Sequence, residues 1–332
     1  MAELTTKYLG LSLSNPLIIG SSGLTDSVDN IAELEKAGAG AVVLKSLFEE
    51  QIMFEVDASL KEAYRSDMIY SAKSETLDYI DVHIRERTVS AYIKLIKDVK
   101  SKVTIPVIAS INCISANEWV KFANQFEEAG ADALELNIAL LPTDENVDAA
   151  DIEKIYFDII AKVKSHVNIP VSVKITSRFT NPAAMIKKIS EAGVKGIVMF
   201  NRLYTPDFDI NNFEEKTSDT YSSPNETGEV RRWVGIMSPR VKCDLAASTG
   251  VHSSEDLIKQ ILAGAKAVQV VSTIYRNGRE QIQEILGGLN DWMEDKGYNS
   301  IDQFRGKMSQ EETSDPSSYE RIQFMKYFSE IK

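Results

Sequence analysis

The chain has 332 residues, of which 43% are hydrophobic, and its formal net charge at pH 7 is −12. This length suits one large domain with a sizeable core. The acidic balance argues against a general nucleic-acid binder and against a protein of anionic membrane surfaces. The first ten residues do not resemble a secretory signal and no long apolar run occurs, so we expect no membrane span. Two cysteines that lie far apart, Cys113 and Cys243, favour a reduced, cytoplasmic setting without a metal site.

A phrase that ends a helix and begins a strand occurs four times. Each copy has a helix end, a glycine, a short turn and an apolar run; the copies are Lys36–Leu44, Glu128–Leu136, Glu191–Met199 and Leu262–Val270. Glycine reaches the left-handed conformation that ends a helix, and an apolar run suits a strand buried on both faces. Repeated units of this kind predict an α/β fold, a (β/α)8 TIM barrel, as a single domain over residues 1–332.

The first part of the chain predicts a hairpin and four barrel strands. Leu4–Leu13 alternates and turns at Gly10, which favours an N-terminal hairpin at the barrel floor. The predicted strands are Leu17–Gly20, Ala41–Leu44, Val107–Ser110 and Ala133–Asn137, with helices that end at Ala37 or cover His83–Lys102 and Ala116–Ala129. The polar segment 46–81 is too long for an ordinary connection, so we expect a long inserted loop above the strand ends.

The second part predicts four more strands. They are Val171–Ile175, Gly196–Phe200, Asp244–Ser248 and Ala267–Val271, with helices over Asp151–Ser165, from Pro182, over Ser254–Ala263 and over Arg279–Asp295. The polar segment 201–233 predicts a second inserted loop over the site. Few residues separate Gly235 from the seventh strand, so this part of the barrel is either abbreviated or its elements are assigned to the wrong residues.

Polar residues gather where the predicted strands end, which is the face on which TIM barrels carry their active sites. Any strand that meets water ends in polar residues, and this explains many of them. It does not explain Lys174, which lies inside the apolar run Val171–Ile175. An unpaired buried ammonium is costly, so this lysine predicts a bound anion or an electron-rich ring beside it.

Hydroxyl and glycine residues follow the seventh and eighth strands: Thr249, Gly250, Ser272 and Thr273. Barrels often bind phosphate there through backbone N–H groups and a helix N-terminus. Simple capping of the next helix by Ser253 or Ser254 is the alternative. Together with Lys45, Asn137 and Lys174, the pattern indicates a phosphorylated cofactor across the strand ends.

In order and spacing these residues resemble the dihydroorotate dehydrogenase family, the FMN-dependent TIM barrels of pyrimidine biosynthesis. The resemblance runs from Leu4 to Lys307 and rests on Asn15-Pro16, Ser21–Gly23, Lys45-Ser46, Glu135–Asn137, Val173-Lys174, Ser248–Val251 and Leu262–Ala265. Residues 296–307 resemble the soluble class 1 of that family. Residues 46–52 and 240–242 resemble a subgroup named dihydroorotate dehydrogenase-like, while 107–113 is more similar to the pyrimidine-reducing barrel of dihydropyrimidine dehydrogenase.

The resemblance implies an oxidoreductase that passes hydride from a dihydropyrimidine, dihydroorotate or a related CH–CH substrate, to FMN. It implies catalytic roles for Lys45, Asn137 and Lys174, and substrate binding by Lys45, Asn137 and Asn201. The residues implied at the flavin are Ser21, Ser22, Gly23, Lys45, Ser46, Asn112, Asn137, Lys174, Phe200, Gly235, Thr249, Gly250, Ser272 and Thr273. A homodimer and a redox partner protein are further expectations.

The substrate side departs from the family pattern. The family places a cysteine or serine base three residues after the asparagine, where this chain has Leu140, and leucine cannot accept a proton. Candidate substitutes are Cys113, Asp144, Glu145, Tyr204 and Lys45. Three hypotheses remain: a flavin oxidoreductase with this or another substrate, a non-catalytic flavin-binding partner in a redox complex, and a lyase or isomerase in which Lys174 forms a Schiff base.

Overall fold

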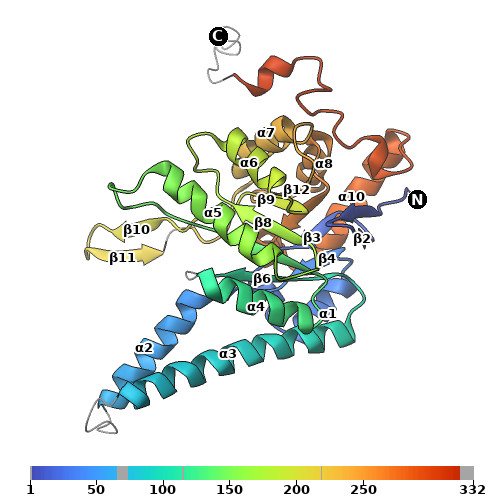
Figure 1. Ribbon diagram of the computed structural model, residues 1–332. Coiled ribbons are helices and arrows are strands. Elements are labelled where there is room, and N and C mark those ends of the chain that lie inside the picture. Colours follow the sequence, from blue (N-terminus) through green and yellow to red (C-terminus); the bar gives the residue numbers. More distant parts are fainter. Residues whose placement is uncertain (1, 66–73, 114–115, 218, 322–332) are drawn as a thin grey trace.

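A closed ring of parallel strands forms the centre of the molecule, with helices on its outside (Figure 1). The computed structural model describes residues 2–65, 74–113, 116–217 and 219–321. Around the ring the strands are β3 (Leu17–Ile19), β4 (Ala41–Val43), β6 (Val107–Asn112), β7 (Ala133–Asn137), β8 (Val171–Ile175), β9 (Gly196–Met199), β12 (Asp244–Ser248) and β13 (Ala267–Val270). The pairings of β13 with β3 and of β4 with β6 close the ring. The predicted (β/α)8 barrel is confirmed.

The outer helices follow from capping and periodicity. They are α1 (Val28–Lys36), α3 (Ser74–Lys102), α4 (Ala116–Glu128), α5 (Ala149–Lys164), α6 (Pro182–Glu191), α7 (Thr227–Met237), α8 (Ser254–Ala263), the short α9 (Ser272–Asn277) and α10 (Gln281–Asp295). Ser253 caps α8 by accepting a hydrogen bond from the Asp256 N–H. The glycines of the four repeated phrases, Gly38, Gly130, Gly193 and Gly264, all have positive φ. Each phrase therefore ends a helix as its sequence predicts.

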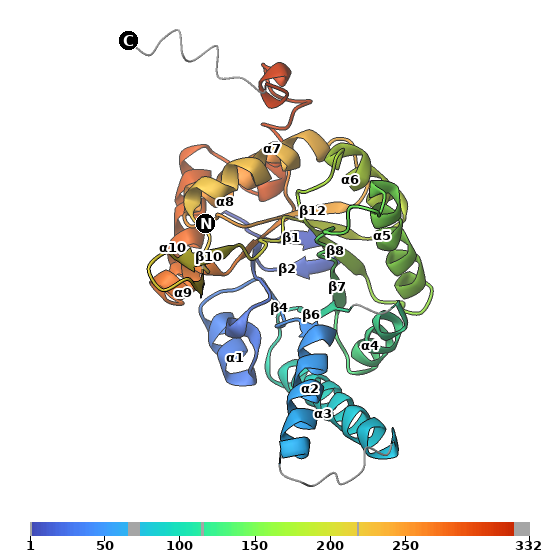
Figure 2. The same cartoon turned by 90° about the vertical axis from the view of Figure 1, so that its left-hand side faces the viewer.

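A hairpin closes the amino end of the barrel, as predicted. Strands β1 (Thr6–Tyr8) and β2 (Leu11–Leu13) pair antiparallel, and Figure 2 shows them across the middle of the ring. Tyr8, Leu9 and Leu13 pack in one buried cluster with residues that point into the barrel, such as Ala41 and Val43 of β4. Val42, between them, belongs to the layer under the helices, so β4 alternates between the two layers.

Segment 46–81 is largely helical where it is described, and the prediction of a long loop was wrong there. Strand β5 (Leu47–Phe48) pairs with the end of β6, and α2 (Glu49–Arg65) follows at once. Helix α3 begins at Ser74, before the predicted start at His83. Together α2 and α3 project from the barrel as an arm (Figures 1 and 2). Ile52 and Val56, one helical turn apart, form the buried face of α2. The segment is polar in its overall composition, so this face was not recognised from the sequence.

The sixth helix is complete, so of the two alternatives the wrong assignment is confirmed and the abbreviated helix is not. Helix α7 covers Thr227–Met237 and begins inside the segment predicted as a loop, directly after a 3-10 turn at Pro224–Glu226. The remaining excursion, 201–226, contains the antiparallel ribbon of β10 (Pro206–Asp209) and β11 (Glu214–Thr217). The sequence contains enough residues for the helix because it begins earlier than Gly235.

The chain after α10 lies across α7 and α8. The Gly306 N–H donates to the Ile261 carbonyl over 3.0 Å, and the Gln310 N–H donates to the Gly235 carbonyl over 2.9 Å. Two 3-10 turns, Ile301–Gln303 and Pro316–Tyr319, belong to this tail. Within the described ranges, no helix has the length and apolar character that a membrane span needs.

Candidate active site at the carboxyl ends of the strands

Three buried polar side chains form a chain of hydrogen bonds inside the barrel. Lys174 Nζ on β8 donates to Gln269 Oε1 on β13 over 2.9 Å. Gln269 Nε2 in turn donates to Glu135 Oε2 on β7 over 2.6 Å. Burial lowers the pKa of Lys174, and the charge of Glu135 opposes that effect. Burial also raises the pKa of Glu135, against the charge of Lys174.

Lys174 and Gln269 line a cavity of about 160 Å³ in the mouth of the barrel. Its walls also include Ser21, Asn201, Thr249, Gly250 and Ser272, which follow β3, β9, β12 and β13. A second cavity of about 360 Å³ shares Asn201, Arg202 and Thr249 with the first. The structure therefore brings together predicted residues from five strands around one recess, next to a buried ammonium group.

The asparagines at the strand ends hold one another. Asn201 Nδ2 donates to Asn137 Oδ1 over 2.8 Å, and Asn112 Nδ2 donates to the Asn137 carbonyl over 2.8 Å. In this arrangement the side-chain oxygen of Asn137 is an acceptor, which leaves its Nδ2 group as a donor towards another partner. Three predicted residues thus form one polar group on β6, β7 and the end of β9.

The serines near the first two strands are tied to the barrel wall. Ser46 N donates to Ser21 Oγ over 2.9 Å, and the Ser46 hydroxyl lies 2.7 Å from that of Ser110. Ser22 caps the 3-10 turn Gly23–Thr25, and a Cβ on Gly23 would lie 2.8 Å from the Tyr275 hydroxyl. Lys45 follows β4 and is exposed at the rim.

A group of hydroxyl and backbone donors lies where we predicted a phosphate site. Thr249 and Gly250 both have positive φ. A Cβ on Gly250 would lie 2.3 Å from the Thr227 nitrogen, so only glycine lets this turn contact the N-terminus of α7. The Gly250 N–H donates to Ser222 Oγ, and the Ser222 N–H donates to Ser272 Oγ. Sequence reasoning missed Ser222 because it is one of many polar residues in segment 201–233 and nothing in the local pattern distinguishes it.

Some predicted residues lie apart from this group. Gly235 is in the second half of α7, where a Cβ would lie 2.3 Å from the Tyr319 ring, and it lines neither mouth cavity. Phe200, by contrast, is buried at the end of β9 beside the group: it lines the second mouth cavity, and its carbonyl accepts a bond from the Thr249 hydroxyl. Buried Thr273 bonds the His252 carbonyl.

The candidate bases differ in their surroundings. Leu140, at the family's base position, packs against the core. Cys113 is buried, and burial together with Glu49 and Glu118 raises its pKa, so it remains a thiol at neutral pH. Asp144, Glu145 and Tyr204 are exposed.

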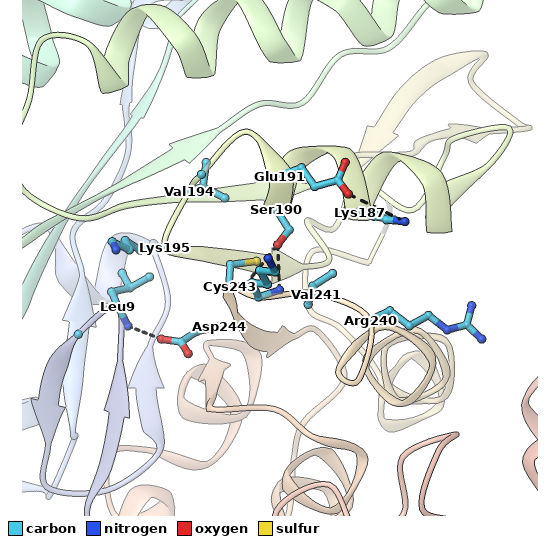
Figure 3. Close-up of a pocket in the computed structure, with 13 residues that line it drawn as sticks. Leu9, Lys187, Ser190, Glu191, Val194, Lys195, Arg240, Val241, Cys243 and Asp244 are labelled. Atoms are coloured by element: carbon cyan, nitrogen blue, oxygen red, sulfur yellow. Dashed lines mark hydrogen bonds and ion pairs between the residues drawn. The ribbon is translucent and has the colours of Figure 1, made fainter.

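A larger cavity, of about 620 Å³, lies at the opposite end of the barrel (Figure 3). It is lined at the amino ends of β9 and β12 by residues such as Lys195, Arg240 and Asp244. Ser190 Oγ accepts bonds from the Lys242 and Cys243 N–H groups there. Asp244 likewise accepts the Leu9 N–H, and Lys187 forms an ion pair with Glu191. We expect the chemistry at the mouth instead, where the buried ammonium group lies.

The donor set of the mouth suits an organic anion. Within the described residues, no cluster of histidine, cysteine and carboxylate side chains is placed to hold a metal ion. Lys174 supplies a positive charge in a polar recess, while Gly250, Ser222 and Ser272 supply neutral donors at the end of α7. A helix N-terminus of this kind favours phosphate.

Comparisons with known proteins agree with this arrangement. A sequence model of the family described as dihydroorotate dehydrogenase matches residues 3–293. The catalytic subunit of dihydroorotate dehydrogenase B (NAD(+)) from Thermoplasma volcanium is 24% identical over 311 residues, which cover 92% of this chain and 98% of that protein. The corresponding subunit from Methanothermobacter thermautotrophicus is 26% identical, over 91% of this chain and 97% of that protein. The chain belongs to the dihydroorotate dehydrogenase family, whose members are flavin-dependent oxidoreductases that act on CH–CH groups.

Proposed function

We propose that this chain uses FMN to oxidise a dihydropyrimidine, with dihydroorotate as the first substrate to test. The observation that carries the proposal is Lys174, which is 9% exposed and whose ammonium group lines the mouth cavity. Its hydrogen-bond acceptor there is the neutral amide of Gln269. Because the Gln269 amide separates Lys174 from the carboxylate of Glu135, the ammonium group can also stabilise a ligand that is negative or becomes negative during the reaction.

The phosphate of FMN would lie against the end of α7. The N–H groups of Gly250 and Ser222 now donate to the hydroxyls of Ser222 and Ser272. Rotation of those two hydroxyls would free both N–H groups for a phosphate without rebuilding the backbone. Thr249 holds the turn through its bond to the Phe200 carbonyl. The ring would then extend from this end towards Lys174, past Ser21.

FMN, when bound, accepts a hydride from the substrate carbon. Lys174 would stabilise the negative charge that accompanies that transfer. Asn137 and Asn201, whose side chains are bonded to each other, would orient the polar edge of the substrate. Lys45, exposed at the rim, would bind the substrate carboxylate.

The lack of an evident proton acceptor at the family's base position raises the possibility of a second substrate class. Leu140 is packed against the core and Cys113 is a buried thiol, so neither supplies a ready base. This favours a related CH–CH substrate that needs no base at that position. The variants Leu140→Ser and Leu140→Cys separate the two cases, with Leu141→Ser, at the exposed neighbour, as a control.

With dihydroorotate as the substrate, Leu140→Ser should speed anaerobic flavin reduction by about 10²-fold or more, the usual contribution of a positioned base. Leu141→Ser should leave it unchanged. Equal rates in wild type and Leu140→Ser would point to the other substrate class, which a panel of dihydropyrimidines would then identify.

The first experiment is an absorbance spectrum of the purified protein, before and after incubation with FMN. We expect a bound flavin that survives gel filtration and is reduced by the substrate without oxygen. A protein that remains colourless after incubation would refute the proposal.

We further propose a homodimer, a redox partner protein and a cytoplasmic setting. The names of the two relatives describe catalytic subunits, which implies further subunits in those proteins. In this chain, Phe208, Ile210 and Phe213 of the β10–β11 ribbon are all more than half exposed, as expected for a protein contact. Light scattering would compare the mass of the wild type with that of a double variant, Ile210→Ser with Phe213→Ser. A lower mass for the variant would support the contact; the same mass for both proteins would exclude the ribbon from the dimer interface.

A further inference from the structure

Glu135 is the most deeply buried charged group in the barrel, and the proposed chemistry assigns it no role. It has no exposed surface and lies on β7 two residues before Asn137. Oε2 accepts the short bond from Gln269, while Oε1 has no hydrogen-bond partner in the parts of the chain that the structure describes. A buried carboxylate normally has both oxygens satisfied, so Oε1 is a natural place for a proton.

The groups that face Glu135 come from four elements. Lys174 on β8 is the cation, and Gln269 on β13 is neutral. The phenols of Tyr8 on β1 and Tyr92 on α3 both sense the Glu135 charge, and burial raises their pKa values further, so they remain neutral. We call Glu135, Lys174, Gln269 and these two phenols the buried layer. Among these five groups, the negative charge of Glu135 balances the positive charge of Lys174.

Gln269 couples these two charges. Its oxygen accepts from Lys174 and its nitrogen donates to Glu135. The reverse orientation would place the amide nitrogen against an ammonium group and the amide oxygen against a carboxylate, which are both unfavourable. The amide orientation is thus fixed by both ends, and a change of charge at either end reaches the other in a region of low dielectric.

We infer that Glu135 takes up a proton when two electrons enter a flavin seated above Lys174, which keeps the total charge of the flavin and the buried layer together constant. This inference rests on the proposed function. A dihydropyrimidine, or dithionite in the test, supplies the two electrons; the flavin gains them with one proton and so gains one negative charge. Glu135 then binds one proton from solvent, changing from carboxylate to carboxylic acid, while Lys174 keeps its own proton.

The physical reason is the cost of an added charge. Burial already raises the pKa of Glu135, and Lys174 is the cation that lowers it. A new negative charge beside Lys174 would offset that help and raise the pKa further. Glu135 is thus a positioning residue whose protonation follows the redox state, without contact with the substrate.

The test is the midpoint potential of the FMN-loaded protein as a function of pH. For a two-electron couple, one proton shifts the potential by about 30 mV per pH unit and two protons by about 60 mV. We expect wild type to show the steeper slope between the Glu135 pKa values of the oxidised and reduced protein, and the shallower slope on either side. Glu135→Gln should show the shallower slope throughout, and Glu135→Asp should keep a steep window at shifted pH.

Ser172→Ala is the matched control, because Ser172 is equally buried and neutral, donates to the Leu134 carbonyl and interacts with the Tyr8 phenol, but carries no charge that could change on reduction. It should follow wild type. If the midpoint potentials of wild type and Glu135→Gln change with pH by the same slope throughout, the inference is overturned, although FMN binding is intact. A protein that cannot bind FMN would overturn the proposed function as well, so the two failures are distinct.

Infrared difference spectra provide a second readout, and its main result comes from the wild-type protein. Reduction of the wild-type protein should add the C=O band of a protonated carboxylic acid, and Glu135→Asp should shift that band. If Glu135→Gln does not fold, this measurement still decides, since the absence of any such band on reduction would contradict proton uptake by a carboxyl group.

Discussion

The two ends of the barrel interior are built from the same strands but in opposite ways. At the floor, Ala133 on β7 packs in an apolar cluster beneath the N-terminal hairpin. Two residues further along the same strand, Glu135 is buried and belongs to the hydrogen-bonded chain with Gln269 and Lys174. Asn137, which bonds Asn201, ends the strand. The floor is mainly apolar, with Asp244 accepting a hydrogen bond from the Leu9 N–H at its edge, whereas the mouth contains an ammonium and a carboxylate group that are costly to bury. We conclude that the residues at the floor serve the stability of the fold, whereas the residues at the mouth serve ligand binding.

The largest expected effect is the loss of the mouth's cation. Lys174→Met should slow anaerobic flavin reduction by about 10²- to 10³-fold, because a fixed charge at the developing anion is lost. Stopped-flow absorbance measures it.

Lys195→Met, at the floor cavity, is the matched control and should keep the wild-type rate. If both variants are equally slow, the division between mouth and floor is wrong.

At the floor we expect a cost in stability without a cost in function. Leu13→Ala removes a side chain that is 2% exposed in the apolar cluster and should lower the free energy of unfolding by about 2–5 kcal/mol. Ser12→Ala, on the exposed face of the same strand, should change it by less than about 0.5 kcal/mol. Urea unfolding measures both, and flavin content should be the same in both variants; a specific loss of flavin in Leu13→Ala would contradict the comparison.

Two glycines separate backbone strain from the contact at the mouth. Gly130 and Gly250 both have positive φ, but a Cβ meets nothing within 4 Å at Gly130 and lies 2.3 Å from Thr227 N at Gly250. Gly130→Ala should cost only about 1–2 kcal/mol of strain. Gly250→Ala should cost more and should weaken FMN binding at least tenfold by calorimetry. Equal affinities would exclude the α7 terminus from the phosphate site.

The smallest effect concerns pH at the floor. Burial raises the pKa of Asp244, whose carboxylate accepts the Leu9 N–H. Its contribution to stability is therefore complete below the ordinary value of 3.8 and is lost as the pH rises through the folded-state value. Asp244→Asn should be more stable than wild type at neutral pH, by less than about 1 kcal/mol after screening by solvent.

Asp29 provides the opposite sign. Its hydrogen bond with Lys102 lowers its pKa, so this contribution is present above the ordinary value and is lost as the pH falls. Asp29→Asn should destabilise at neutral pH and not in acid. Unfolding curves at several pH values distinguish the two, and the same trend in both variants would contradict the assignment.

Local patterns predicted the barrel because each strand carries its own signal. The glycines of the four repeated phrases adopt the positive φ that ends a helix, and Lys174 was conspicuous inside an apolar strand. Partners across the barrel carry no such signal: Glu135 and Gln269 bond over a separation of 134 residues. Helix α2 was missed because its buried face is narrow, and the start of α7 because Ser222–Pro224 is typical of a loop.

Ring closure has a consequence for how the molecule is made. Strand β3, near the start of the chain, is flanked on one side by β13, near its end. During synthesis one hydrogen-bonding edge of β3 therefore remains unpaired until β13, late in the chain, has left the ribosome. Such an edge can recruit a neighbouring nascent chain, so we expect yield in cells to depend on chaperone supply more than on the stability of the finished protein.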